Sequence, residues 1–149
     1  MRSVRVSGLP LVVAAVAVLA VGCGGEAAPV EVSVADACSQ EHHGHRVTVE
    51  GFLRLPSKLE LSDTAVIEVF SLMQGDGDSV PLRLKIGDGP SELRDLPSTY
   101  TASSLRVGVE NAKQTASIID RVVVTAKVSD EDGVCVLTSP RIERAPEDG

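Results

Sequence analysis

The stretch Arg46-Val-Thr-Val-Glu-Gly-Phe-Leu-Arg-Leu55 alternates apolar and polar side chains with a period of two. Its apolar face consists of Val47, Val49, Leu53 and Leu55. Alternation of this kind is typical of a β-strand that buries one face. Gly51 interrupts the pattern, which predicts a bulge or a sharp bend inside the strand.

The same alternation returns further along the chain, at residues 80–86, 105–109 and 121–128. A segment at 65–73 is apolar on both faces and predicts a further strand. Runs of glycine and aspartate separate these segments and predict turns. The run Asp130-Glu-Asp-Gly133 predicts a hairpin loop, followed by a returning strand at 134–138, a break at Pro140 and an edge segment at 141–144.

Two short segments favour helices rather than strands. Asp36 can cap a helix over residues 36–43, and Gly44 can end it. In residues 110–119 the apolar side chains recur at helical spacing, so we expect a second short helix there.

This succession of short strands with a late hairpin resembles an OB-fold. Three segments carry the resemblance, namely Val47-Thr-Val-Glu-Gly51, Ile119-Asp-Arg-Val-Val-Val-Thr-Ala-Lys-Val128 and Val134-Cys-Val-Leu137. The chain is similar to exported OB-fold proteins of bacteria over residues 36–144. The resemblance implies a mainly β fold, a small five- to six-stranded OB-like barrel with one or two short helices. A small β-sandwich is the alternative, because short valine-rich strands build both architectures.

The N-terminus has the parts of an export signal. Two arginines precede an apolar run at residues 9–21, which is shorter than the roughly 20 residues that a membrane-spanning helix needs. The run ends in Leu19-Ala-Val-Gly-Cys23, which resembles the lipobox of bacterial lipoproteins. That resemblance implies removal of residues 1–22 and attachment of lipid to Cys23, with several acyl chains that anchor firmly.

The lipobox also implies a location and a division of the chain. We expect a protein of the cell envelope, anchored by lipid on the extracytoplasmic side, at the outer membrane or on the outer face of the plasma membrane. Residues 23–35 contain Gly, Ala, Pro and Glu and predict a flexible tether. Residues 36–144 would form the barrel domain, and residues 145–149 a frayed tail.

Charge restricts the partners of the mature chain. Removal of residues 1–22 takes away two arginines and no acid, so the net charge changes from −7 to −9. Such a domain is unsuited to nucleic acid, whose binding depends on neutralised phosphates and on stacking aromatic side chains. The only aromatic residues are Phe52, Phe70 and Tyr100. The acidic domain also repels anionic lipids, so we expect membrane contact through the lipid anchor alone.

The chain has three cysteines. With Cys23 attached to lipid, Cys38 and Cys135 remain as an even pair in an oxidising compartment, where disulfides persist. We therefore expect a disulfide between Cys38 and Cys135. Two buried free thiols are the alternative.

All three histidines of the chain lie in Glu41-His-His-Gly-His45. Imidazole nitrogens bind Zn²⁺ and Cu²⁺, so His42, His43 and His45 are candidate metal ligands. A helix would bring His42 and His45 to one face, whereas an extended chain would bring His43 and His45 together. Structural zinc sites normally use four convergent ligands, so a solvated segment that is simply rich in histidine is the alternative.

The sequence contains no recognisable catalytic residues. It lacks a Gly-x-Ser-x-Gly motif, and it has no cysteine free to act as a nucleophile. We therefore expect a non-enzymatic, membrane-anchored lipoprotein that binds another envelope protein or a glycan, or serves a structural role. The alternatives are a metal-handling lipoprotein that uses the three histidines, and a small hydrolase of unrecognised type.

Overall fold

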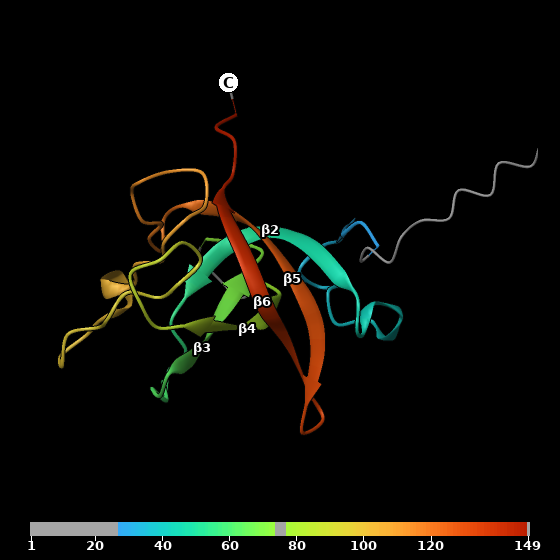
Figure 1. Ribbon diagram of the computed structural model, residues 1–149, viewed down its shortest axis with the longest axis horizontal. Helices are drawn as coiled ribbons and strands as arrows, with labels where there is room; N and C mark the ends of the chain where they lie inside the picture. The colour runs from blue at the N-terminus through green and yellow to red at the C-terminus, as the bar shows by residue number, and fades with distance from the viewer. Residues whose placement is uncertain (1–26, 74–76, 149) are drawn as a thin grey trace, which may run out of the picture.

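The computed structural model describes residues 27–73 and 77–148. Five of its strands form a closed barrel: β2 (Arg46–Arg54), β3 (Thr64–Phe70), β4 (Ser79–Lys85), β5 (Arg121–Glu131) and β6 (Val134–Arg144). They pair in the order β2-β3-β4-β6-β5, and β5 also pairs with β2, which closes the ring (Figure 1). A sixth, short strand, β1 (Val30–Glu31), runs parallel to β2. The expected mainly β fold, a small barrel of five to six strands, is confirmed.

The helical content is smaller than expected. It consists of two single-turn 3-10 helices in the described residues, Gln40–His42 and Ala102–Ser104. None of the described residues belongs to a helix that is long and apolar enough to cross a membrane. The signal segment 1–22 and Cys23 lie outside the described residues.

Aliphatic side chains alone fill the core that the described residues form. In β2 the buried positions alternate strictly, as the sequence predicts, and β4 and β5 repeat the pattern. The largest fully buried side chains are those of Leu53, Ile67, Leu82, Leu84, Leu93, Leu105, Leu137 and Ile142. Because valine and leucine fill the interior, both phenylalanines lie outside it, half-buried on the outer face.

Gly51 marks the point where β2 changes partner. The strand pairs with β5 over Arg46–Phe52 and with β3 over Phe52–Arg54. A Cβ atom at Gly51 would lie 2.3 Å from the carbonyl oxygen of Phe70 in β3. Only glycine allows this approach, so the predicted interruption at Gly51 is where β2 passes from one neighbour to the other. The strand as a whole is strongly curved (Figure 1).

The β5–β6 hairpin contains the expected turn and one irregularity that the sequence did not reveal. Asp132 and Gly133 form a two-residue turn with positive φ angles of 54° and 81°. Further along, the register shifts between Lys127↔Thr138 and Thr125↔Arg141, so that two residues of β6 oppose one residue of β5. Pro140 therefore does not end the strand, which continues through this β-bulge to Arg144.

The long connection between β4 and β5, residues 86–120, is irregular, and its only helical part is the 3-10 turn at Ala102–Ser104. The helix expected over 110–119 is wrong, because the amide of Ala116 donates to the carbonyl of Val107 at 2.8 Å and not to the preceding turn. The amide of Val107 donates to the carbonyl of Ala116 at 3.0 Å. Val107 also forms an antiparallel β-bridge with Leu93. The connection thus adds isolated bridges to the sheet and packs Leu105 and Val107 into the core.

The N-terminal segment also differs from expectation. Of the short helix expected over residues 36–43, only one 3-10 turn is present, at Gln40–His42. Residues 34–38 form turns, because the Ser33 hydroxyl and carbonyl hold the amide of Asp36. Residues assigned to a flexible tether enter the fold: β1 pairs with β2, and Val34 is 4% exposed in the core. Apolar burial of this kind fixes a segment whose composition alone predicts flexibility.

The C-terminal residues are attached to the barrel rather than frayed. The amide of Ala145 donates to the carbonyl of Arg121 at 2.9 Å. In return, the Arg121 guanidinium donates to the Pro146 carbonyl and to the Asp148 carboxylate, each at 3.0 Å. These bonds hold residues 145–148 beside the start of β5.

Candidate functional site

Cys38 and Cys135 lie together as a disulfide-capable pair, as the sequence predicts. Their Sγ atoms are 2.02 Å apart and their Cα atoms 5.9 Å apart, which is within the normal range for a disulfide. Cys38 ends the turn that follows β1, and Cys135 is the second residue of β6. The pair therefore joins the N-terminal segment to the β5–β6 hairpin across 97 positions of sequence.

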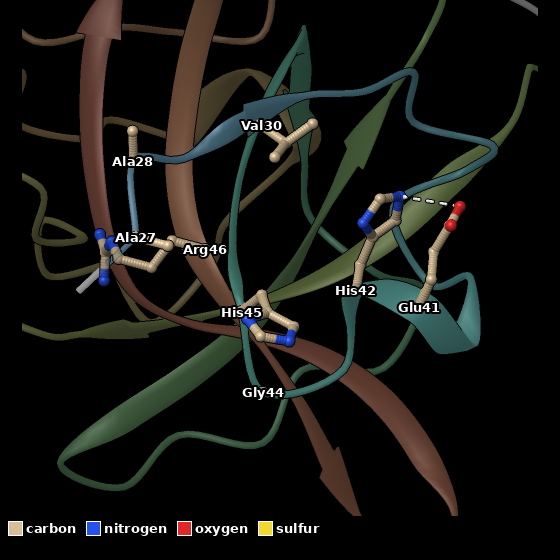
Figure 2. A pocket seen from close by; sticks show the side chains of 8 residues that line it. All are labelled: Ala27, Ala28, Val30, Glu41, His42, Gly44, His45 and Arg46. Carbon is tan, nitrogen blue, oxygen red and sulfur yellow. Dashed lines mark ion pairs between the residues drawn. The ribbon is translucent and has the colours of Figure 1, made fainter. Parts of the chain in front are cut away.

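The histidine-rich segment is held at the start of β2 by backbone hydrogen bonds to β5. The amide of Gly44 donates to the carbonyl of Val128 at 2.8 Å, and the amide of Val128 donates to His45 at 2.9 Å. Gly44 has a φ of +80°, which suits glycine and turns the chain into β2. This turn directs His42 and His45 to one side of the segment (Figure 2).

We call the hollow beside them the tether-side pocket. It measures about 360 Å³. It is lined by Ala27, Ala28 and Val30 of the N-terminal segment and by Glu41, His42, Gly44, His45 and Arg46 around the start of β2. The Arg46 side chain extends away from the rings of His42 and His45, on the side of the view where Ala27 lies (Figure 2). The structure thus brings two of the three predicted histidines to one pocket. His43 does not line it.

The polar groups of the tether-side pocket are only partly engaged. Glu41 approaches Nε2 of His42 with an Oε1 to Nε2 distance of 3.6 Å, and the His42 side chain is 15% exposed. Arg46 uses Nη2 to donate to the carbonyl oxygens of Thr125 and Ser139, both at 3.2 Å. Among the described residues, Nε and Nη1 of Arg46 make no hydrogen bond, so they remain available as donors.

The metal hypothesis requires several ligands that converge. In the part of the chain that the structure describes, no group of three or more His, Cys, Asp or Glu side chains is arranged to hold a metal ion. His42 and His45 share the tether-side pocket, but His43 is not part of its lining. The zinc or copper site at His42, His43 and His45 stays a prediction.

A second pocket, which we call the seam pocket, opens where the barrel is least completely paired. β4 and β6 are parallel and share a single register pair, Leu82↔Leu137. Beyond that pair the strands separate around a hollow of about 470 Å³. It is lined by Thr64 and by residues 83–85, 90–92, 110 and 138–140.

Two serines of the seam pocket have left-handed backbone conformations. Ser91 has a φ of 57° and Ser139 a φ of 50°, values that L-residues other than Asn and Asp seldom adopt. Ser91 is 8% exposed, its hydroxyl donates to Glu110 at 2.8 Å, and it accepts a hydrogen bond from the amide of Ile142 at 2.8 Å. Backbone strain of this kind concentrates at ligand-binding sites.

The seam pocket carries charges of both signs. Arg83 forms a bidentate pair with Glu131 and donates to the Thr64 hydroxyl at 3.2 Å. Lys85 is exposed on the same strand, while Glu92 and Glu110 approach from the connection. The sequence did not predict this pocket, because its lining comes from β3, β4, the connection and β6. Ser91 and Ser139 lie in segments that predict only turns or breaks.

The outer face of β2 and β3 carries the two phenylalanines as a cross-strand pair, Phe52↔Phe70. The Arg54 guanidinium lies 4.2 Å from the centroid of the Phe70 ring and donates to the backbone carbonyls of Leu72 and Met73. Arg54 is therefore engaged within the protein, where it covers the ring of Phe70 on the outer face.

The sequence matches no protein-family model and no curated protein. Among solved structures, the chain is similar to a protein assigned as an aspartyl-tRNA synthetase from Leishmania major Friedlin. The two are 14% identical with a TM-score of 0.45, and the match covers 78% of this chain but only 21% of that one. A likeness at this level carries no argument for the activity of this protein.

Proposed function

We propose that this protein is a lipid-anchored module of the cell envelope, whose barrel lies on the extracytoplasmic side and binds another envelope component without catalysing a reaction. The observation that carries the proposal is the pairing of Cys38 with Cys135. It leaves Cys23, at the end of an export-like segment, as the one remaining cysteine of the sequence.

The cysteine pair supports the location in a second way. Disulfides persist in oxidising compartments and are rare in the cytosol. The two cysteines are 97 residues apart in the sequence, and their loop encloses most of the barrel. Closure of so long a loop restricts the unfolded chain strongly, so a small domain of this kind gains most from folding where the bond can form.

The seam pocket is the proposed ligand site. It combines basic and acidic side chains with four hydroxyl-bearing residues, which come from β3, β6 and the connection. A mixed lining of this kind suits a ligand that carries both charges and hydrogen-bonding groups, such as a peptide terminus or a charged glycan.

The positions of the nucleophilic and basic groups favour binding over hydrolysis. A serine nucleophile needs a general base within hydrogen-bond reach. Glu110 lies within that reach of Ser91, but Ser91 is buried and its oxygen accepts from the amide of Ile142, so the hydroxyl is held by bonds within the fold. The three histidines lie in the segment before β2, and none of them lines the seam pocket.

The anchor is tested by intact mass spectrometry of the full-length protein purified from bacterial membranes. We expect cleavage before Cys23 and a mass increase of a diacylglycerol and an acyl chain, both absent in Cys23→Ser. The matched control is the Cys38→Ser/Cys135→Ser double variant, which should keep the lipid. Lipid-free protein, or peptide mapping that joins Cys23 to another cysteine, would overturn the proposal.

The binding role is tested by photocrosslinking in the native envelope. A photoreactive residue placed at Lys85, in the seam pocket, should give a discrete crosslinked product. The same residue at Tyr100, exposed on the connection and outside the pocket, is the control. Equal crosslinking from both positions, or none from Lys85, would contradict binding at the seam.

A further inference from the structure

The tether-side pocket concentrates hydrogen-bond donors on a domain that is otherwise strongly acidic. The mature chain carries a net charge of −9, yet His42, His45 and Arg46 lie around one hollow. Among the described residues, Glu41 is the one acid in the lining. Its carboxylate approaches Nε2 of His42, so the other ring nitrogen is left for a second partner (Figure 2). The pocket therefore offers donors suited to an anion.

The place of the pocket in the chain decides which anion can reach it. Ala27 and Ala28 form one wall, and only three residues separate Ala27 from Cys23. Four residue steps span at most about 14 Å, even fully extended. A bilayer of about 40–45 Å has a hydrocarbon core of about 30 Å, so its head groups form a layer several Å deep on each side. With Cys23 acylated, the pocket is held beside that layer.

We propose that the tether-side pocket binds the phosphate of a membrane lipid head group, next to the site where the protein is anchored. The free Nε and Nη1 of Arg46 supply a planar donor pair that matches phosphate oxygens, and the rings of His42 and His45 donate from the opposite wall. This inference rests on the proposed lipid anchor and adds a specific contact to it.

The contact has an orienting effect. An acidic domain on a tether is repelled by an anionic membrane surface, and nothing else in the tether would select one face of the barrel. A phosphate bound in the tether-side pocket would turn the face of the barrel that carries this pocket towards the membrane. The connection 86–120 lies on the opposite side of the barrel (Figure 1), so it points away from the bilayer.

The test uses the full-length lipidated protein in two kinds of vesicle, made of phosphatidylglycerol or of the phosphate-free lipid digalactosyldiacylglycerol. Each histidine is modified with diethylpyrocarbonate, and the extent of modification is read residue by residue by mass spectrometry. In phosphatidylglycerol, modification of His42 and His45 should slow by about tenfold, the factor expected for one charge-assisted hydrogen bond. His43, in the same segment but outside the pocket, is the internal control.

Variants separate the pocket from general proximity to the membrane. Arg46→Gln should remove the slowing at both histidines, and so should Arg46→Ala. Because Arg46 also bonds to Thr125 and Ser139, the exposed variant His45→Gln is a second test: it should weaken the slowing at His42 without unfolding the barrel. His43→Gln should leave the slowing unchanged.

Equal modification of His42 and His45 in the two lipids, or slowing that survives Arg46→Gln, would overturn the phosphate contact. Equal slowing of all three histidines would overturn it as well, because it would indicate shielding without a pocket. The same spectra report the lipid on Cys23. Absence of that lipid refutes the proposed anchor, whereas lipidated protein with unslowed His42 and His45 refutes only the phosphate contact.

Discussion

At Gly51, β2 and β3 approach so closely that a side chain would meet backbone. A Cβ atom there would lie 2.3 Å from the Phe70 carbonyl oxygen and 3.1 Å from a methyl group of Val69. Backbone atoms in the middle of a sheet move only if the register around them moves. The curvature of β2, and with it the closure of the barrel, therefore depends on the absence of a single methyl group.

The variant Gly51→Ala should lower the free energy of unfolding by about 2–3 kcal/mol, because it forces overlap with the backbone of β3. Urea unfolding of the oxidised protein measures this. Gly133→Ala is the control: its φ of +81° strains any side chain, but no atom lies within 4 Å, so we expect a loss of only about 1 kcal/mol. An equal loss in both variants would contradict the role assigned to Gly51.

Asp120 is held as a carboxylate by a small network before β5. Burial raises the pKa of Asp120, but the amide and hydroxyl of Ser117 and the guanidinium of Arg144 lower it further, so that the pKa lies below its ordinary value of 3.8. The Ser117 amide is 2.7 Å and Arg144 Nη1 is 2.8 Å from the carboxylate oxygens. Arg144 also donates to the Thr115 carbonyl, so the network fixes the end of the connection against β6.

This lowered pKa predicts how stability depends on pH. The carboxylate stabilises the fold fully above its unfolded-state pKa, and the contribution is lost as the pH falls through the lower, folded-state pKa. Asp120→Asn should therefore cost about 1 kcal/mol near pH 7, and its difference from the wild type should shrink towards about pH 3. The measurement is the urea midpoint across this range, with the exposed Asp148→Asn as control. A difference that is constant with pH would contradict the assignment.

Among the elements, β6 explains where sequence patterns succeed and where they fail. β2, β4 and β5 follow a strict period of two, and the alternation predicts both their limits and their buried faces to within a few residues. In β6 the inward side chains change from an odd position, Leu137, to an even one, Ile142, because the bulge inserts one residue. A period-two pattern cannot register such a change.

The absence of the helix expected over residues 110–119 and the missed seam pocket have a related cause. The backbone of Ala116 bonds to Val107, and that of Glu110 to Ile142, so long-range pairing overrides the local spacing. The walls of the seam pocket come from segments far apart in the sequence, and no local pattern marks them. The histidine segment, in contrast, is local, and the sequence anticipated that His42 and His45 could share one side.

The bulge leads to a prediction for Ser139. Its φ of 50° is a left-handed conformation, and the Ser139 carbonyl that accepts from Arg46 belongs to the backbone. Ser139→Gly should therefore keep that bond and raise the free energy of unfolding by about 0.5–1 kcal/mol, while the β-branched Ser139→Val should lower it by more. Thermal unfolding distinguishes the two. A destabilised Ser139→Gly would indicate that the serine side chain itself holds the bulge.

At the scale of the whole molecule, the barrel is small and its core contains no aromatic ring among the described residues. Aliphatic burial must therefore be supplemented by a constraint on the unfolded chain. The Cys38–Cys135 pair supplies that constraint, because it joins the segment before β2 to the last strand.

Loss of this pair should destabilise the barrel more than any single substitution above. In the chain-entropy model, opening a loop of this length costs about 4–5 kcal/mol. We expect a large drop in melting temperature for Cys38→Ala/Cys135→Ala and for the reduced protein, and none for Cys23→Ser. Non-reducing peptide mapping should recover Cys38 joined to Cys135. Free thiols at both positions, or equal melting of oxidised and reduced protein, would contradict this.

The separation of these two cysteines in the sequence also bears on the order of events in the export that we propose. A chain that leaves the cytoplasm N-terminus first exposes Cys38 long before Cys135, and in that interval the nearest sulfur is that of Cys23. Three thiols permit three pairings, of which one is native. A thioether cannot take part in thiol exchange, so the proposed attachment of diacylglycerol to Cys23 would leave Cys38 with a single possible partner. The lipid would then act as a protecting group for oxidative folding before it serves as an anchor.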